Sequence, residues 1–235
     1  MYKRQLHIRL KLTDSPRFRD LVERRADVAS PLAVTLRTQT RALLRTVGLV
    51  LVGTVGTYVV LLYLPSYYAA VVGVPMTDAL LANLAGLALF TVAVPVLARW
   101  SDTVGRRPLL LAAAAGPLVL ALPAFLLIST ASPAAIVLAQ AVLSLCVALW
   151  AGAAPTALVE LFPTAVRASS LGLGYSVTVS LFGGLSPLVV TYLSTTTGNV
   201  LVPAFVIMGA AAVTLLTALG LPETAHRPLR HTEEG

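Results

Sequence analysis

The charged side chains of this sequence gather in short segments, and these are the places where polar chemistry is possible. One of them, ARWSDTVGRRP at residues 98–108, contains one aspartate and three arginines. A second, ELFPTAVRAS at residues 160–169, contains one glutamate and one arginine. Carboxylates and guanidinium groups form strong charge-assisted hydrogen bonds. We therefore expect one ion-pair cluster, with Glu160 paired to Arg106 or Arg107 and with Asp102 and Arg167 alongside.

Outside these two segments, residues 46–222 are almost uncharged. Of its 235 residues, 57% are hydrophobic and 11% are charged, and the mean hydropathy is +0.85. Soluble domains have about a quarter of their residues charged, so lipid must be the solvent for most of this chain. The formal charge of +7 is explained by basic residues at membrane edges. We therefore expect a lipid bilayer, and no nucleic acid, as a partner.

Three long blocks define the membrane-spanning part. Residues 46–98 contain Asp78 as their only charge, and residues 108–159 and 168–222 contain none. Each block has room for two crossings of roughly 20 residues and has a turn signal near its middle. The blocks lack the alternation of barrel strands. The sequence therefore predicts an all-α membrane protein with six transmembrane helices at about 46–71, 79–98, 109–128, 134–158, 170–193 and 201–221.

The basic residues fix the expected orientation. The 17 lysines and arginines lie before the first expected helix, in the two loops that contain the charged segments, and after the last helix. Since basic loops stay in the cytoplasm, both termini are expected there. Residues 1–45 are expected to form a basic cytoplasmic segment with short amphipathic helices. Residues 46–222 form the bundle, and residues 223–235 form a cytoplasmic tail.

Several motifs together resemble the major facilitator superfamily. They are SDTVGRRP after the second span, ELFPTAVRAS, GYSVTVSLFGGLSP in the fifth span, and PETAHRP after the last. With YLPSYY and TDSPRF, they are most similar to the metabolite:proton symporter branch, which includes proline/glycine-betaine transporters. Members have twelve spans, and this chain resembles the last six. The resemblance implies the C-terminal half-bundle, with the end of the preceding helix within residues 1–45 and with an N-terminal six-helix half as the missing partner.

The start of the sequence bears on this expectation. Its first five residues, MYKRQ, resemble a translated adapter, so we expect a truncated N-terminus. The alternative is a natural half-length gene.

The resemblance also assigns a role to the charged segments. In the superfamily such loops latch the two halves together on the cytoplasmic side. Ala98 and Thr103 depart from the superfamily pattern, where a glycine and a basic residue are usual, while Gly105 supplies a tight turn. The alternative is that these charges are solvated markers of the membrane edge. The candidate gate residues are Asp102, Gly105, Arg106, Arg107, Glu160 and Arg167.

The substrate pathway is expected among polar and aromatic residues at mid-membrane depth. The resemblance implies that the first and fourth spans line the central cavity, and aromatic faces suit a quaternary ammonium group. The six spans contain no ionisable acid or base, so a proton-coupling carboxylate is expected in the missing half. Packing between helices is the competing interpretation. The candidates are Thr54, Tyr58, Gln140, Ser144, Trp150, Tyr175 and Ser176.

These features together predict a secondary active transporter of the bacterial plasma membrane. We expect a proton-coupled symporter of a small polar solute such as betaine, proline or an organic acid. A sugar-porter-like carrier and a half-carrier that acts as a binding or regulatory module are the alternatives. An enzyme is not expected, because the spans lack paired acids, a serine with a basic partner, and metal ligands. The single cysteine, Cys146, is expected to pack, and no cofactor or metal is expected.

Overall fold

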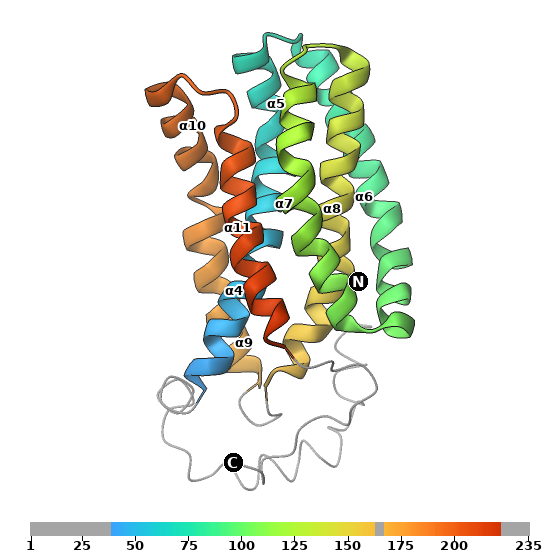
Figure 1. Ribbon diagram of the computed structural model, residues 1–235, viewed down its shortest axis with the longest axis vertical. Coiled ribbons are helices and arrows are strands. Elements are labelled where there is room, and N and C mark those ends of the chain that lie inside the picture. Colours follow the sequence, from blue (N-terminus) through green and yellow to red (C-terminus); the bar gives the residue numbers. More distant parts are fainter. Residues whose placement is uncertain (1–38, 163–166, 222–235) are drawn as a thin grey trace, which may run out of the picture.

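The computed structural model describes residues 39–162 and 167–221, and these residues form a bundle of helices without strands (Figure 1). Six helical segments are long and apolar enough to cross a membrane. The predicted all-α membrane fold is therefore confirmed. The sequence predictions for residues 1–38 and 222–235 lie outside the described part of the chain. The six crossings are Thr40–Val72, Met76–Val104, Arg106–Ile128, Pro133–Glu160, Arg167–Thr197 and Val202–Leu219.

Four of the crossings are single helices, and two are interrupted by π-helical turns. The single helices are α6 (Met76–Val104), α7 (Arg106–Ile128), α8 (Pro133–Glu160) and α11 (Val202–Leu219). The first crossing consists of α4 (Thr40–Gly56), η2 (Thr57–Tyr63), α5 (Leu64–Tyr67) and η3 (Tyr68–Val72). The fifth consists of α9 (Arg167–Thr178), η4 (Val179–Gly183) and α10 (Ser186–Thr197).

The helices pack so that the first crossing is the most enclosed. α8 packs against α6 and α7, α11 packs against α7 and α4, and α4 also packs against α9 (Figure 1). The first crossing has the largest buried share of the six, whereas α6 and the fifth crossing have the smallest. The latter two therefore present most of their side chains to the outside of this bundle.

Small residues allow the close helix contacts that replace a hydrophobic driving force in lipid. A Cβ added at Gly86 of α6 would lie 2.6 Å from Ser144 Oγ and 2.7 Å from Gln140 Cγ in α8. Nearer the other end, a Cβ at Gly152 of α8 would lie 3.0 Å from the backbone nitrogen of Ala98. The superfamily pattern has a glycine at the position of Ala98 in α6. Here the helices still pack closely at Ala98, because the facing residue of α8 is a glycine, Gly152.

The described arginines all lie at one end of the bundle, where α4, α7 and α9 begin and where α6, α8 and α11 end. We call this the basic end. Asp78, in the first turn of α6, lies at the opposite end. The arginines of the basic end are Arg41, Arg45, Arg99, Arg106, Arg107 and Arg167.

Candidate functional site

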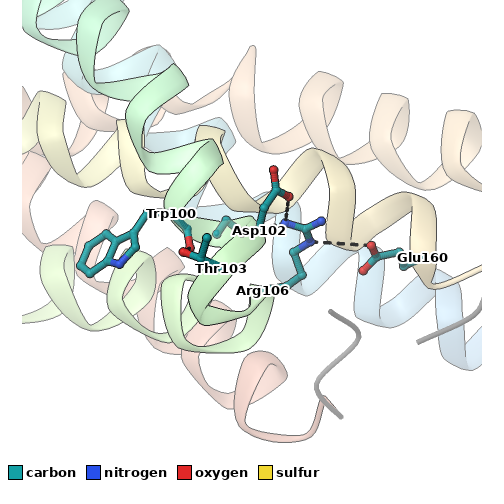
Figure 2. A network of polar contacts seen from close by, with 6 residues as sticks. Trp100, Asp102, Thr103, Arg106 and Glu160 are labelled. Atoms are coloured by element: carbon teal, nitrogen blue, oxygen red, sulfur yellow. Dashed lines mark hydrogen bonds and ion pairs between the residues drawn. The ribbon is translucent and has the colours of Figure 1, made fainter. Parts of the chain in front are cut away.

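Arg106 connects the second and fourth crossings at the basic end (Figure 2). From the start of α7, its Nη1 donates a hydrogen bond to Asp102 Oδ1 of α6. Its Nε lies 3.7 Å from Glu160 Oε1 at the end of α8. The pairing of Glu160 with Arg106, one of the two partners predicted from the sequence, is therefore confirmed.

The two ion pairs of Arg106 differ in their exposure to solvent. The side chain of Asp102 is 64% exposed, whereas those of Arg106 and Glu160 are 13% and 17% exposed. Exposed pairs contribute ~0–1 kcal/mol, and removing one partner of a shielded pair costs more because the other charge is left behind. Loss of Glu160 is therefore expected to destabilise the bundle more than loss of Asp102.

Gly105 makes this geometry possible. It alone separates α6 from α7, with φ 114° and ψ 159°, a conformation that side chains of L-residues rarely adopt. Its N–H donates to Ser101 O at 3.1 Å, which ends α6. The tight turn expected at Gly105 is present, and it brings Asp102 and Arg106 together across the helix junction.

Thr103 stands where the superfamily pattern has a basic residue. Its hydroxyl donates to the Trp100 carbonyl at 2.9 Å, within its own helix (Figure 2). A basic side chain at this position would have reached outward from α6. In this chain the ion pairs that connect α6, α7 and α8 are made by Arg106, and Thr103 takes no part in them.

Arg107 and Arg45 both bind the carboxyl end of α11. Arg107 Nη2 donates to Leu219 O at 3.1 Å, and Arg45 Nη2 donates to Gly220 O at 3.5 Å. The last carbonyls of a helix lack partners within the helix and carry partial negative charge, so guanidinium groups stabilise them. Sequence reasoning missed Arg45, for which the one available signal was its place at the edge of a charge-free block.

Arg167 lies beside the cluster but makes a different contact. Its Nε donates to Phe162 O at 3.1 Å, just beyond the end of α8. Among the described residues no ion pair joins Arg167 to Asp102 or Glu160. Arg167 therefore holds the carboxyl end of α8, and its expected place in the ion-pair network stays a prediction.

The candidate pathway residues fall into two groups. Thr54, Gln140, Ser144 and Trp150 are at most 8% exposed, with Trp150 Nε1 donating to Leu49 O at 2.7 Å. The structure does not bring all the candidates together, because Gln140 and Ser144 face α6 whereas Trp150 faces α4. The more open candidates are Tyr58, which is half-buried, and the exposed Tyr175 and Ser176.

Gln140 is the centre of a buried polar network. Its Oε1 accepts the Tyr68 hydroxyl at 2.6 Å, and its Nε2 donates to Val60 O at 3.1 Å and to Asn83 Oδ1 at 3.0 Å. Asn83 Nδ2 in turn donates to Leu61 O at 3.3 Å. Both carbonyls belong to η2, where the π-helical turn changes the regular ladder. Gln140 thus satisfies backbone and side-chain groups of this bundle.

Thr54 and Tyr58 lie in the seam between the first and fifth crossings. A Cβ added at Gly183 of η4 would lie 2.7 Å from Thr54 Cγ2 and 2.8 Å from Tyr58 Cε2. Further along the seam, the Thr191 hydroxyl donates to the Tyr63 hydroxyl at 3.0 Å. Tyr58, which lies against Gly183 in this seam, is more exposed than the other candidates from the first and fourth crossings.

Known proteins resemble the chain over most of its length. A family model described as sugar (and other) transporter matches residues 15–235. The ectoine/proline transporter of Corynebacterium glutamicum is 31% identical over 236 positions, which cover 95% of this chain and 46% of the relative. The proline/betaine transporter of Escherichia coli is 33% identical over 190 positions, which cover 81% of this chain and 38% of the relative.

A third relative is named for a broader range of solutes. The glycine betaine/proline/ectoine/pipecolic acid transporter of Dickeya dadantii is 30% identical over 234 positions, with 96% of this chain and 46% of the relative covered. The chain spans less than half the length of each of these relatives. These relatives are transporters, not enzymes.

Proposed function

The chain belongs to the sugar (and other) transporter family of the major facilitator superfamily, and from this premise we propose that it supplies one six-helix half of a secondary transporter for small zwitterionic solutes. The observation that carries the proposal is its similarity, at 30–33% identity over most of its length, to transporters named for proline, betaine or ectoine. Such solutes combine a cationic nitrogen with a carboxylate in one small molecule.

The seam between the first and fifth crossings is the place we propose for contact with the solute. Tyr58 is half-buried there, with Gly183 packed against one edge of its ring, so a solute would meet the part of the ring that stays exposed. Attraction between a cationic nitrogen and a tyrosine face is worth about 2 kcal/mol when water is excluded. Thr54 of α4, which also lies against Gly183, adds a hydroxyl.

The basic end is proposed to face the cytoplasm of a bacterial cell. Basic residues are retained on that side of the inner membrane, and each described arginine lies at this end. The Asp102–Arg106–Glu160 cluster, together with Arg107 and Gly105, would then form the inner gate, where α6, α7 and α8 are joined. An ion-pair cluster that links helices is suited to two alternative arrangements.

Proton coupling is proposed to depend on residues outside the described part. The described carboxylates are Asp78, Asp102 and Glu160, and each lies at or near a helix end and not at mid-membrane depth. A proton relay within a membrane needs an ionisable side chain inside the bundle. We therefore propose that the other half supplies it.

Uptake by cells that express the full-length carrier tests the function. Radiolabelled glycine betaine and proline are compared with a dicarboxylate, in the presence and absence of a protonophore. The expected result is saturable uptake of the zwitterions that the protonophore abolishes. Uptake of the dicarboxylate without the zwitterions would overturn the proposed solute class, and uptake that is insensitive to the protonophore would overturn the proton coupling.

A further inference from the structure

One turn of α4 is bridged by a side chain from the last crossing. The hydroxyl of Thr214 in α11 donates to Gly48 O at 2.7 Å and accepts the Val52 N–H at 3.1 Å. Gly48 O and Val52 N are the acceptor and donor of a single rung of the helical ladder, four residues apart. Thr214 is fully buried, so its hydroxyl serves this rung and not solvent.

The next carbonyl of the same turn is also bound from outside α4. Trp150 Nε1 of α8 donates to Leu49 O at 2.7 Å, and both residues are buried. In the hydrocarbon core no water replaces such a partner if it is lost. The turn at residues 48–53 is thus held by side chains of α11 and α8 together.

This turn is weak by itself, because it begins and ends with glycine. Glycine in a helix interior costs about 1 kcal/mol relative to alanine. Neither glycine has room for a side chain, since a Cβ at Gly48 would overlap Thr217 and a Cβ at Gly53 would overlap the Trp150 indole. Side chains that insert at a rung are a recognised cause of helix bending. The direction of α4 beyond Gly53 therefore depends on these outside bonds.

The segment beyond the turn carries Thr54 and Tyr58. Tyr58 lies five residues, or about 7 Å along the axis, beyond Gly53, so a change of about 10° in the bend displaces it by about 1 Å. A Cβ placed at Gly183 would overlap both side chains, so each packs closely against the fifth crossing. A displacement of this size would open or close their contact with the fifth crossing.

We propose that Thr214 is a positioning residue for transport: by bridging the Gly48–Val52 rung, it sets the direction of the part of the first crossing that carries Thr54 of α4 and Tyr58 of η2. The role of that segment rests on the proposed function. The bridged turn itself is a property of the fold and is tested separately. Thr214 acts through α4 and needs no contact with the solute.

Two substitutions in the full-length carrier separate the hydroxyl from the shape of the side chain. Thr214→Val keeps the shape and removes the hydroxyl, whereas Thr214→Ser keeps the hydroxyl. The matched control is Thr91→Val in α6, the same exchange at an exposed threonine whose hydroxyl donates to Leu87 O of its own helix at 2.8 Å. For glycine betaine uptake we expect KM to rise about fivefold in Thr214→Val and to stay within about twofold of the parent in the other two variants.

A spectroscopic measurement follows the turn without transport. In purified carrier whose other tryptophans are phenylalanine, including Trp100→Phe, the emission of Trp150 reports the indole that binds Leu49 O. We expect Thr214→Val to shift the wavelength of this emission, while Thr214→Ser and Thr91→Val leave it at the parent position. If Thr214→Val does not fold, Thr214→Cys is measured instead. We expect it to raise KM for glycine betaine and to shift the Trp150 emission in the same direction as Thr214→Val.

The outcomes are distinct. Parent-like emission in Thr214→Val would overturn the proposal, because the turn would then not depend on the hydroxyl. Shifted emission with an unchanged KM would also overturn it, because the turn would move without moving the solute contacts. If the parent carrier transports no zwitterion, the proposed function fails, and the shift of Trp150 emission alone still decides whether Thr214 sets the turn.

Discussion

Arg106 Nε lies 3.7 Å from Glu160 Oε1, and this contact joins the start of α7 to the end of α8. Residues 106 and 160 are separated in sequence by two complete crossings, α7 and α8. The pair therefore ties the start of the first of these helices to the end of the second, at the basic end. Arg106 also binds Asp102 across the Gly105 turn, which brings α6 into the same cluster. One guanidinium group therefore connects three crossings.

Removing the charge of Glu160 tests the shielded pair. Glu160→Gln leaves Arg106 with low exposure and without this partner, so we expect the free energy of unfolding to fall by about 1 kcal/mol or more. Asp102→Asn is the matched control, because Asp102 is mostly exposed and its loss should cost less than about 0.5 kcal/mol. Thermal unfolding of the purified carrier gives the comparison, and equal effects of the two variants would contradict the assignment.

Charge reversal tests the gate separately from stability. Glu160→Arg places two guanidinium groups together at the basic end and is expected to lower the maximal uptake rate severalfold. Arg106→Glu in the same chain restores attraction and should recover part of the rate, although it places a carboxylate near Asp102. No recovery in the double variant would indicate that this pair has no role in gating.

Replacing Gly105 tests the turn between α6 and α7. Because φ at Gly105 is 114°, we expect Gly105→Ala to reduce the free energy of unfolding by about 1–3 kcal/mol. The control is Gly209→Ala in α11, where an added Cβ meets nothing within 4 Å and should be neutral or slightly stabilising. The melting temperatures of the two variants are compared. A parent-like melting temperature for Gly105→Ala would contradict the expected strain of a side chain at this turn.

The buried polar network gives a third test of stability. Tyr68→Phe removes the hydroxyl that donates to Gln140 Oε1 and leaves this oxygen buried without that donor. We expect a loss of about 1–3 kcal/mol in the free energy of unfolding. Tyr192→Phe serves as the control, since Tyr192 is 64% exposed, and should change it by less than about 0.5 kcal/mol.

Chemical labelling tests the proposed orientation. Thr103 and Thr195 are both exposed and lie near opposite ends of the bundle, in α6 and α10. We expect a membrane-impermeant thiol reagent to label Thr195→Cys in intact cells, and to label Thr103→Cys only after the membrane is opened. The native Cys146 is buried and should stay unlabelled. Labelling of both introduced cysteines from the same side would contradict the six-crossing topology.

The six crossings and the family were predictable from the sequence, and both predictions are confirmed. Long blocks without charge are a strong signal, because lipid excludes charged side chains over a fixed thickness. The motif ELFPTAVRAS placed Glu160 at the membrane edge facing the segment with Arg106 and Arg107. The choice between these two arginines needed the direction of each side chain at the start of α7, which composition does not encode.

The internal contacts of the first crossing were not predictable. The π-helical turn of η2 depends on how Gln140 and Asn83 bind Val60 O and Leu61 O, and these donors come from two other crossings. Sequence reasoning noted Gln140 as a pathway candidate and did not include Asn83 among the candidates. Apolar blocks carry no periodic signal for such contacts, because all faces of the helices are hydrophobic.

The carbonyls of the first crossing have consequences for how this protein can change over generations. Donors at four positions in three other helices bind its backbone: Thr214, Trp150, Gln140 and Asn83. An alkyl group at any of them leaves a main-chain oxygen in hydrocarbon without that donor. Random mutagenesis under selection for a folded carrier should therefore preserve hydrogen-bond donors at these positions, while the outward face of α6 accepts any apolar residue.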